Sequence, residues 1–285
     1  MHKESLGYAC QLFGVDRQVY YRSVKRGNIK RDKAEKVVAM VTELRQMMPC
    51  LGGRKMYYLL QAQLEGLFIG RDKFFAILKA NHLLIVPKRT YHVTTNSMHH
   101  FKKHDNLLIN ITIERPNQVW VADITYIGKR TNPIYLSLIT DAYSKKIVGY
   151  YVAGNLSTES SVLALKMALK ERKDKSESLV HHSDRGIQYC ADAYQEVLQK
   201  NKILCSMTQN SDPYENAVAE RINGILKQEF MIDRFDKSLE TIKVLVKQSV
   251  DVYNEKRPHL SNYLLTPNQM HQQNKIKFKT YKKQQ

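Results

Sequence analysis

Three carboxylates in this sequence have the residue types and the spacing of a site for divalent metal ions. Asp123 lies within an apolar run, Asp184 follows the residues HHS at 181–183, and Glu220 comes after a further 35 residues, positions 185 to 219. Magnesium prefers oxygen ligands, and two ions held by a few carboxylates can drive phosphodiester chemistry. The pattern therefore predicts metal-dependent cleavage or transfer of phosphodiesters.

Each of these residues also has an ordinary structural explanation. Asp123 could lie at a strand edge, Asp184 could belong to a turn with Gly186, and Glu220 could be a surface charge on a helix. The chain has 27 acidic residues, so chance triples are numerous. Asp123 favours the functional interpretation, because a carboxylate among apolar neighbours is costly to bury without a partner. Three carboxylates that lie close together repel one another, so we expect them to bind cations or to raise the pKa of one of their own carboxyl groups.

The elements that must position these carboxylates form an α/β pattern from residue 118 onward. Three strand-like runs with short connections predict an antiparallel meander, and two strand–helix–strand crossovers follow it. We expect a mixed sheet with flanking helices, in which Asp123 lies in a strand, Asp184 at a strand end and Glu220 on a helix. The expected strands are 118–127, 134–141, 146–153, 179–182 and 203–207, and the expected helices are 158–172, 191–200, 216–230 and 239–255.

Basic residues are concentrated on both sides of this region. The net charge of the chain is +18. Residues 1–110 hold 19 Lys/Arg against 8 Asp/Glu, residues 111–236 hold 16 against 16, and residues 237–285 hold 10 against 3. Basic flanks suit the phosphate backbone of nucleic acid, and simple solubility is the alternative. A basic arm is expected where five lysines fall between 275 and 283.

Two helical modules are expected before the sheet. Residues 1–30 predict a helix-turn-helix-like segment with a turn at Gly14 and Asp16 as N-cap, and residues 46–90 predict a second one. Their outward basic side chains suit contacts with DNA, and a solvated helical hairpin is the alternative. Residues 91–110 predict a linker. The expected DNA-binding residues of the two modules are Arg17, Arg22, Arg71 and Lys73.

The predicted helix that carries Glu220 has a polar stripe. Asn216, Glu220, Asn223 and Lys227 follow one another at steps of four, three and four residues and therefore share one helix face. We expect Asn223 and Lys227 to contact DNA, and a solvated face is the alternative. A domain boundary is expected at about residue 236, after which residues 237–285 form a C-terminal helix and the basic tail.

Other site classes lack support in the sequence. Four scattered cysteines without a C-x-x-C pattern do not indicate a structural zinc site. No apolar run has the 18 or so residues of a membrane span, and the N-terminus lacks the apolar core of a signal peptide. We therefore expect a cytoplasmic protein that has no membrane partner.

Several motifs together resemble one known family. The chain is similar to the orfB-type transposases of insertion-sequence family three, whose integrase core is related to retroviral integrases. The spacing of Asp184 and Glu220 is that family's pattern. The motifs are residues 13–21, 120–125, 182–189, 216–220, 253–259 and 266–267, so the resemblance covers nearly the whole chain.

The resemblance implies a ribonuclease H-like core in which Asp123, Asp184 and Glu220 hold Mg²⁺ or Mn²⁺, with two ions expected. It implies cleavage of double-stranded DNA at the ends of an insertion sequence, followed by strand transfer through the freed 3′-hydroxyl. Lys227 matches a position used for DNA contact. Asp141 and Ser144 match a common motif of the core, to which we give a structural role.

The sequence departs from the family pattern beside the expected site. Glu215 precedes Asn216 where the family often has Asp, and a glycine often seen in the preceding loop is replaced within residues 210–213. The chain resembles the downstream reading frame of a frameshift fusion. We therefore expect a homo-oligomer on DNA in the bacterial nucleoid and an upstream-frame product as fusion partner. The alternative is a DNA-binding regulator without catalysis, or a product inactive without that partner. A ribonuclease H-type nuclease would leave both basic flanks unexplained.

Overall fold

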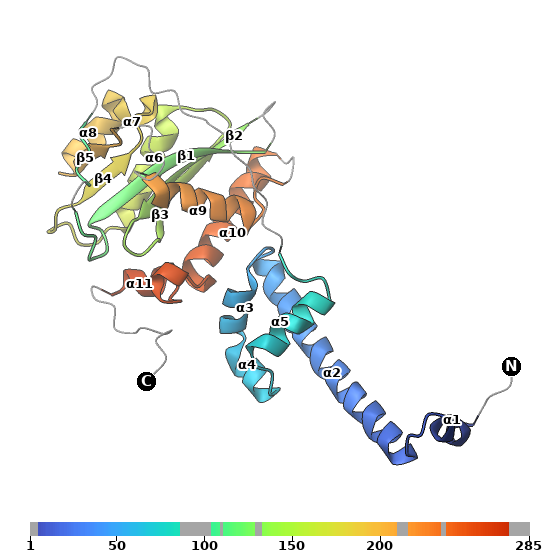
Figure 1. The fold of residues 1–285 in the computed structure, drawn as a ribbon. Coiled ribbons are helices and arrows are strands. Elements are labelled where there is room, and N and C mark those ends of the chain that lie inside the picture. The colour runs from blue at the N-terminus through green and yellow to red at the C-terminus, as the bar shows by residue number, and fades with distance from the viewer. Residues whose placement is uncertain are drawn as a thin grey trace. The chain divides into compact units, whose positions relative to one another are not determined.

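The computed structural model describes residues 5–85, 104–108, 111–128, 133–209, 216–234 and 238–273. The chain divides into two compact units (Figure 1). The first comprises residues 1–46 and 51–87, and the second comprises residues 47–50 and 88–285. Most of the expected linker, 91–103 and 109–110, and the basic tail at 275–283 lie outside the described residues.

The first unit is helical. Helix α1 (Leu6–Leu12) is followed by a turn in which Gly14 has a φ of +61°, and Asp16 Oδ1 accepts a hydrogen bond from Gln18 N at 2.6 Å. Both features were expected from the sequence. The remaining helices of this unit are α2 (Arg17–Met47), α3 (Gly53–Leu59), α4 (Gln61–Gly66) and α5 (Arg71–Ala80).

Helix α2 differs from the expected short second helix. It is continuous for 31 residues, so the boundary expected at residue 30 falls inside a helix. Its C-terminal half buries Val37 and Val41, and Lys33 Nζ donates to the carbonyl oxygen of Leu67 at 2.8 Å. Tertiary packing of that half extends the helix past Gly27 and Asn28, residue types that often end a helix. The first predicted module belongs to the first unit, and so does the second apart from residues 47–50 and 88–90.

The second unit is built on a five-stranded sheet with the order β3-β2-β1-β4-β5. Strands β1, β2 and β3 form an antiparallel meander, and β4 and β5 are parallel to β1. This is the expected mixed sheet, and it has the arrangement of a ribonuclease H-like core. The strands are β1 (Val119–Ile127), β2 (Ile134–Asp141), β3 (Ile147–Ala153), β4 (Val180–Ser183) and β5 (Leu204–Met207).

Helices cover both faces of this sheet (Figure 1). Helix α6 packs on β3 and β2 and is joined by α8, whereas α9 packs on β1 and β2 from the other face. Each expected helix of this region is present to within two residues at its ends. The helices are α6 (Thr158–Glu171), α7 (Ile187–Cys190), α8 (Asp192–Lys200), α9 (Ala217–Gln228), α10 (Leu239–Lys256) and α11 (Pro267–His271), with a 3₁₀ turn at Leu260–Asn262.

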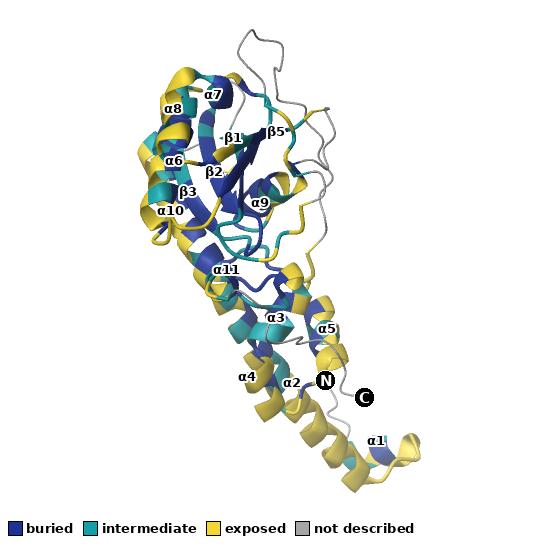
Figure 2. Cartoon of the chain, turned by 90° about the vertical axis from the view of Figure 1, so that its left-hand side faces the viewer, coloured by how far each residue is buried: buried dark blue, intermediate teal, exposed yellow. Residues whose placement is uncertain are grey.

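Alternation along β1 separates two cores. Trp120 and Ala122 are buried with Leu165 of α6, while Val119 and Val121 are buried with residues of the α9 side. Successive residues of a strand point to opposite faces, so Asp123 points to the α9 side with Val119 and Val121. The strands appear as the dark interior of this unit in Figure 2.

Helix α6 approaches the sheet at Gly149 of β3. A Cβ atom at this position would lie 2.3 Å from the carbonyl oxygen of Ala164 and 2.9 Å from the Cβ of Ala168. Only glycine permits such close contact between helix and strand. No helix in the part of the chain that is described is long and apolar enough to cross a membrane.

Candidate metal and nucleic-acid site

The strand register brings Asp123 and Asp184 together. Strands β1 and β4 are parallel, and Val119 pairs with Val180 and Val121 with His182, a constant offset of 61 positions. The same offset, continued two residues further, places Asp184 beside Asp123 and on the same face of the sheet. Adjacent strands lie about 4.8 Å apart. The carboxylate in the middle of β1 therefore meets the one that directly follows β4.

Asp123 is held by two hydrogen bonds. Its Oδ2 accepts from Asn223 Nδ2 at 2.7 Å, and its Oδ1 accepts from the backbone N–H of Ile124 at 2.9 Å. Burial raises the pKa of the Asp123 carboxyl to about 7, with repulsion from Asp184 second and from Glu220 a smaller cause, against the two hydrogen bonds. Protein surrounds this carboxyl although it keeps some access to solvent.

Asp184 is partly buried like Asp123, whereas Glu220 is exposed. Asp184 Oδ1 accepts from the backbone N–H of Gly186 at 3.0 Å, in the turn that was expected after β4. Glu220 lies in the first turn of α9 on its exposed side, and partial burial raises the pKa of its carboxyl. The electrostatic effect of both residues on Asp123 shows that the three carboxylates share one neighbourhood.

The three carboxylates provide the donor atoms that a divalent cation prefers, but they do not surround a common point. Three oxygen donors that repel one another are the donor set that magnesium or manganese prefers. Within the described ranges, however, no three His, Cys, Asp or Glu side chains gather closely enough to hold a metal ion. The three carboxylates therefore have the right chemical type for a divalent cation, but their side chains are not close enough together to form a complete set of ligands.

Two amides of α9 attach this helix to β1 on either side of Glu220. Asn216 Nδ2 donates to the carbonyl oxygen of Ala122 at 3.1 Å, and Asn223 donates to Asp123. Asn223 is buried, so its side chain faces the carboxylates rather than a surface where DNA could lie. Its hydrogen bond positions Asp123, and its contact with DNA stays a prediction. The seven-residue spacing of these amides was visible in the sequence, but their partners were not.

Lys227 lies on the same helix, one turn beyond Asn223. Its Nζ is 4.3 Å from the centre of the Tyr126 ring, a distance at which a cation is attracted to the ring face. Burial lowers the pKa of this ammonium group, and the charges of Asp233 and Asp123 oppose that shift. Tyr126 was not identified from the sequence, where it is one of two aromatic residues in the strand.

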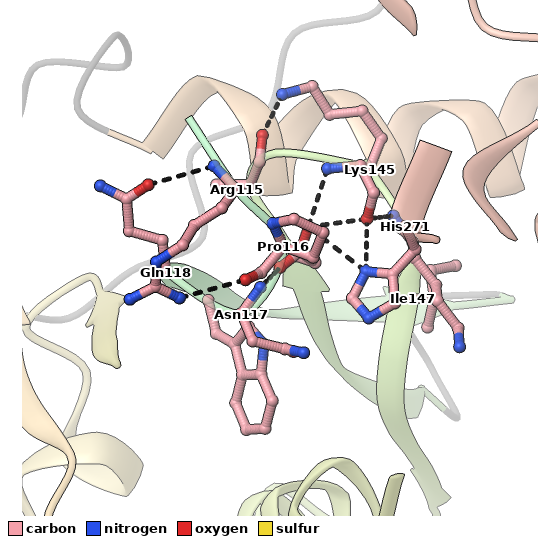
Figure 3. A network of polar contacts seen from close by, with 12 residues as sticks. Arg115, Pro116, Asn117, Gln118, Lys145, Ile147 and His271 are labelled. Atoms are coloured by element: carbon pink, nitrogen blue, oxygen red, sulfur yellow. Dashed lines mark hydrogen bonds and ion pairs between the residues drawn. The ribbon is translucent and has the colours of Figure 1, made fainter. Parts of the chain in front are cut away.

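Asp141 has the structural role expected of it. Its buried carboxylate accepts from Asn117 N at 2.7 Å and from Ser144 N and Oγ at 2.7 and 2.6 Å. Ser144 Oγ also lies 2.9 Å from His271 Nδ1. Asn117 and His271, more than 150 positions apart in the sequence, converge on this network (Figure 3). The network fixes the turn between β2 and β3.

The other predicted DNA contacts belong to the first unit. Arg17 and Arg22 lie on the first turns of α2, where every residue from 17 to 32 is exposed, and Arg22 also contacts Gln18 Oε1 at 3.3 Å. Arg71 and Lys73 are exposed at the start of α5. Arg71 forms an ion pair with Asp72 at 3.2 Å. These side chains are accessible, and their contact with DNA stays a prediction.

Comparison with known proteins identifies the family. Two models described as integrase core domain match residues 113–213 and 201–267. A 31 kDa protein of insertion element IS600 from Shigella sonnei is 34% identical over 257 residues, which are 88% of this chain and 92% of that protein. This chain belongs to the insertion-sequence transposases with an integrase core. The family-three transposase InsF of Escherichia coli is 29% identical over 70% of the chain and 69% of its own length.

Other transposases of the family match over a shorter part. The chain spans about half the length of several curated relatives, 48% of one and 53% of another. Among solved structures, the catalytic core domain of HTLV-2 integrase in complex with magnesium has a TM-score of 0.44 at 18% identity. That likeness covers 55% of this chain and 97% of the integrase domain.

Proposed function

We propose that this transposase cleaves DNA at the ends of an insertion sequence and then joins the freed ends to target DNA. In the first reaction, water attacks phosphorus and the 3′ oxygen of the element leaves. In the second, that 3′-hydroxyl attacks a phosphodiester of the target, and the target's own 3′ oxygen leaves. The observation that carries the proposal is the position of Asp123, which the parallel strand register sets beside Asp184 and which accepts a hydrogen bond from Asn223 on the helix that carries Glu220.

Asp123 and Asp184 would hold one divalent ion, and Glu220 would help to hold a second. Two Mg²⁺ or Mn²⁺ ions, when bound, supply activation of the attacking oxygen and stabilisation of the leaving oxygen. Asn223 keeps Asp123 oriented through its hydrogen bond at 2.7 Å. Without a cation the cluster is a set of repelling carboxylates, which favours binding of positive charge.

Positively charged side chains would hold the DNA backbone. Lys227 lies on the helix that carries Glu220, so its ammonium group could neutralise a phosphate close to the carboxylates. Arg17, Arg22, Arg71 and Lys73 would contact DNA from the first unit. The net charge of +18 supports double-stranded DNA as the partner. We also propose action as a homo-oligomer on the bacterial nucleoid, with an upstream-frame product as possible fusion partner.

A second candidate is a DNA-binding regulator without catalysis, or a chain inactive without that partner. One observation favours it: the described side chains do not gather into a three-ligand metal cluster. DNA or a fused partner would then be needed to complete the site. The two candidates differ in whether the isolated chain cleaves DNA.

The decisive experiment is nicking of a labelled duplex that carries the element's end, with Mg²⁺, by the purified chain. The Glu220→Gln variant should cleave DNA at least about 100-fold more slowly than the wild type. Substituting a residue that only supports a metal ligand typically costs about 10–100-fold in activity. The DNA affinity of Glu220→Gln should stay within about twofold, because the substitution removes a metal ligand and no basic contact. The exposed Glu196→Gln on α8 is the matched control.

The outcomes separate the candidates. Cleavage by wild type and by Glu196→Gln, but not by Glu220→Gln, supports a self-sufficient transposase. Salt-sensitive DNA binding without cleavage by any of the three supports the regulator. Equal loss of binding and cleavage in Glu220→Gln would contradict the metal role of this residue.

A further inference from the structure

The C-terminal motif at residues 253–259 takes no part in the proposed chemistry, yet its polar side chains are buried. Tyr253, Asn254, Arg257 and His259 are each less than 10% exposed. Buried polar groups need partners, so the partners of these residues indicate what the motif holds in place. They lead to two places, the turn before β3 and the end of α9.

The first half of the motif attaches α10 to the start of β3. Asn254 Oδ1 accepts from the backbone N–H of Ile147, and Asn254 Nδ2 donates to the carbonyl oxygen of the same residue, both at 3.0 Å. Tyr253 Oη donates to the carbonyl oxygen of Lys145 at 2.7 Å. This turn is already fixed by Asp141, so α10 has a rigid support.

The second half of the motif attaches the end of α9. Arg257 Nε and Nη2 donate to the two carboxylate oxygens of Glu229 at 2.9 and 2.8 Å, with side chains 2% and 16% exposed. Two parallel hydrogen bonds from a guanidinium group fix direction as well as distance. Glu229 is the C-cap residue of α9, the helix that carries Glu220 and Asn223.

Helix stability does not explain a glutamate at this position. The C-terminal end of a helix carries partial negative charge, so a carboxylate there is unfavourable unless a cation compensates it. Removing one member of a buried pair also leaves an uncompensated charge. The ion pair between Glu229 and Arg257 is therefore better explained by a role in fixing the position of the helix end. The same residue receives a second contact, since Cys50 N donates to the Glu229 carbonyl oxygen at 2.9 Å.

We propose that Glu229 and Arg257 are positioning residues for the metal ligand Glu220. They hold the end of α9 while Asn216 and Asn223 hold it against β1, so the helix cannot slide or rotate relative to Asp123. Glu220 lies nine positions before Glu229, about 13 Å along the helix axis. A released helix end would move the Glu220 carboxylate away from the two aspartates. This inference rests on the proposed function, because it assumes that Glu220 binds a metal ion.

Two conservative variants test the proposal in the full chain. Glu229→Gln keeps the shape but loses the charge, and Arg257→Lys keeps the charge but loses the paired hydrogen bonds. Both should raise the dissociation constant for Mn²⁺, measured by electron paramagnetic resonance, about 10-fold. In metal-free protein they should accelerate amide hydrogen exchange in α9 but not in α6. Lys200→Gln, which removes an exposed ion pair with Glu196 on α8, is the matched control.

A purely structural role would give a different result. Exchange that rises equally in α6 and α9, or Mn²⁺ affinity that stays at the wild-type value in both variants, would overturn the proposal. The Asp123→Asn variant separates this result from failure of the proposed function. If Mn²⁺ binding by wild type does not depend on Asp123, the metal site itself is wrong, and selective exchange in α9 then decides whether the anchor exists.

Discussion

Helix α6 covers one face of the sheet with mainly apolar contacts, whereas α9 covers the other with a mixture of apolar and amide side chains. On the α6 face, Trp120, Ala122 and Leu165 are fully buried. On the α9 face a smaller core around Val121 and Ala219 borders Asp123 and its amide partners. Stability and chemistry are thus divided between two faces of the same strands, and substitutions on each should have different consequences.

The largest expected effect is on the α9 face. Asp123→Asn should reduce Mg²⁺-dependent cleavage at least about 1000-fold, a barrier change of about 4 kcal/mol, because a metal ligand is lost. The free energy of unfolding at pH 8 should not fall, since a repelled buried charge is removed. Parallel measurement of cleavage and chemical denaturation checks both. A variant that unfolds would show that this face also carries stability.

The α6 face should respond in the opposite way. Leu165→Ala removes a fully buried side chain, and such changes cost about 2–5 kcal/mol of unfolding free energy through lost burial and the cavity left behind. Cleavage per folded molecule should be unchanged. Urea denaturation followed by fluorescence of Trp120, the one tryptophan of the chain, measures the loss. A loss of cleavage without a loss of stability in Leu165→Ala would contradict the assignment of stability to the α6 face and chemistry to the α9 face.

The pH dependence of stability should come from the α9 face. In the folded protein the pKa of Asp123 is about 7, against an ordinary aspartate value of 3.8. Between these values the folded state keeps a proton that the unfolded chain releases, so stability of the metal-free protein should fall as pH rises from about 4 to about 7. Denaturation across this range should show the slope, and Asp123→Asn should flatten it. An equal slope in the variant would assign it to another group.

The smallest effect is expected for Lys227, at the edge of the α9 face. Lys227→Gln should weaken DNA binding at low salt and reduce the slope of log affinity against log salt by about 1, because one phosphate contact is lost. Lys200→Gln on α8 is the control. Titrations by fluorescence anisotropy at several salt concentrations give the slopes. An unchanged slope would show that Lys227 does not contact a DNA phosphate and only packs against the Tyr126 ring.

Local patterns were sufficient for most of the second unit. Alternating apolar residues and short turns predicted all five strands. Side-chain periodicity depends on neighbours along the chain, which explains this agreement. The length of α2 was not predicted, because burial of Val37 and Val41 by other helices extends it.

The polar partnerships needed the tertiary structure. Asn223 was expected to face DNA but donates to Asp123, 100 positions away, and His271 reaches Ser144 across 127 positions. Helical spacing shows which residues share a face but not what that face meets. The pairing of Arg257 with Glu229 was equally hidden, since both residues are ordinary charges in the sequence.

The sequence by itself determined the strands, the α9 helix and the three carboxylates with their spacing, because these depend on side-chain period and residue type. The tertiary structure alone decided which face of β1 meets α9, how the parallel register sets Asp184 beside Asp123, and which polar groups fix the helix. These depend on contacts between distant segments. The raised pKa of Asp123 follows from the same contacts, since burial and neighbouring charge exist only once the chain has folded.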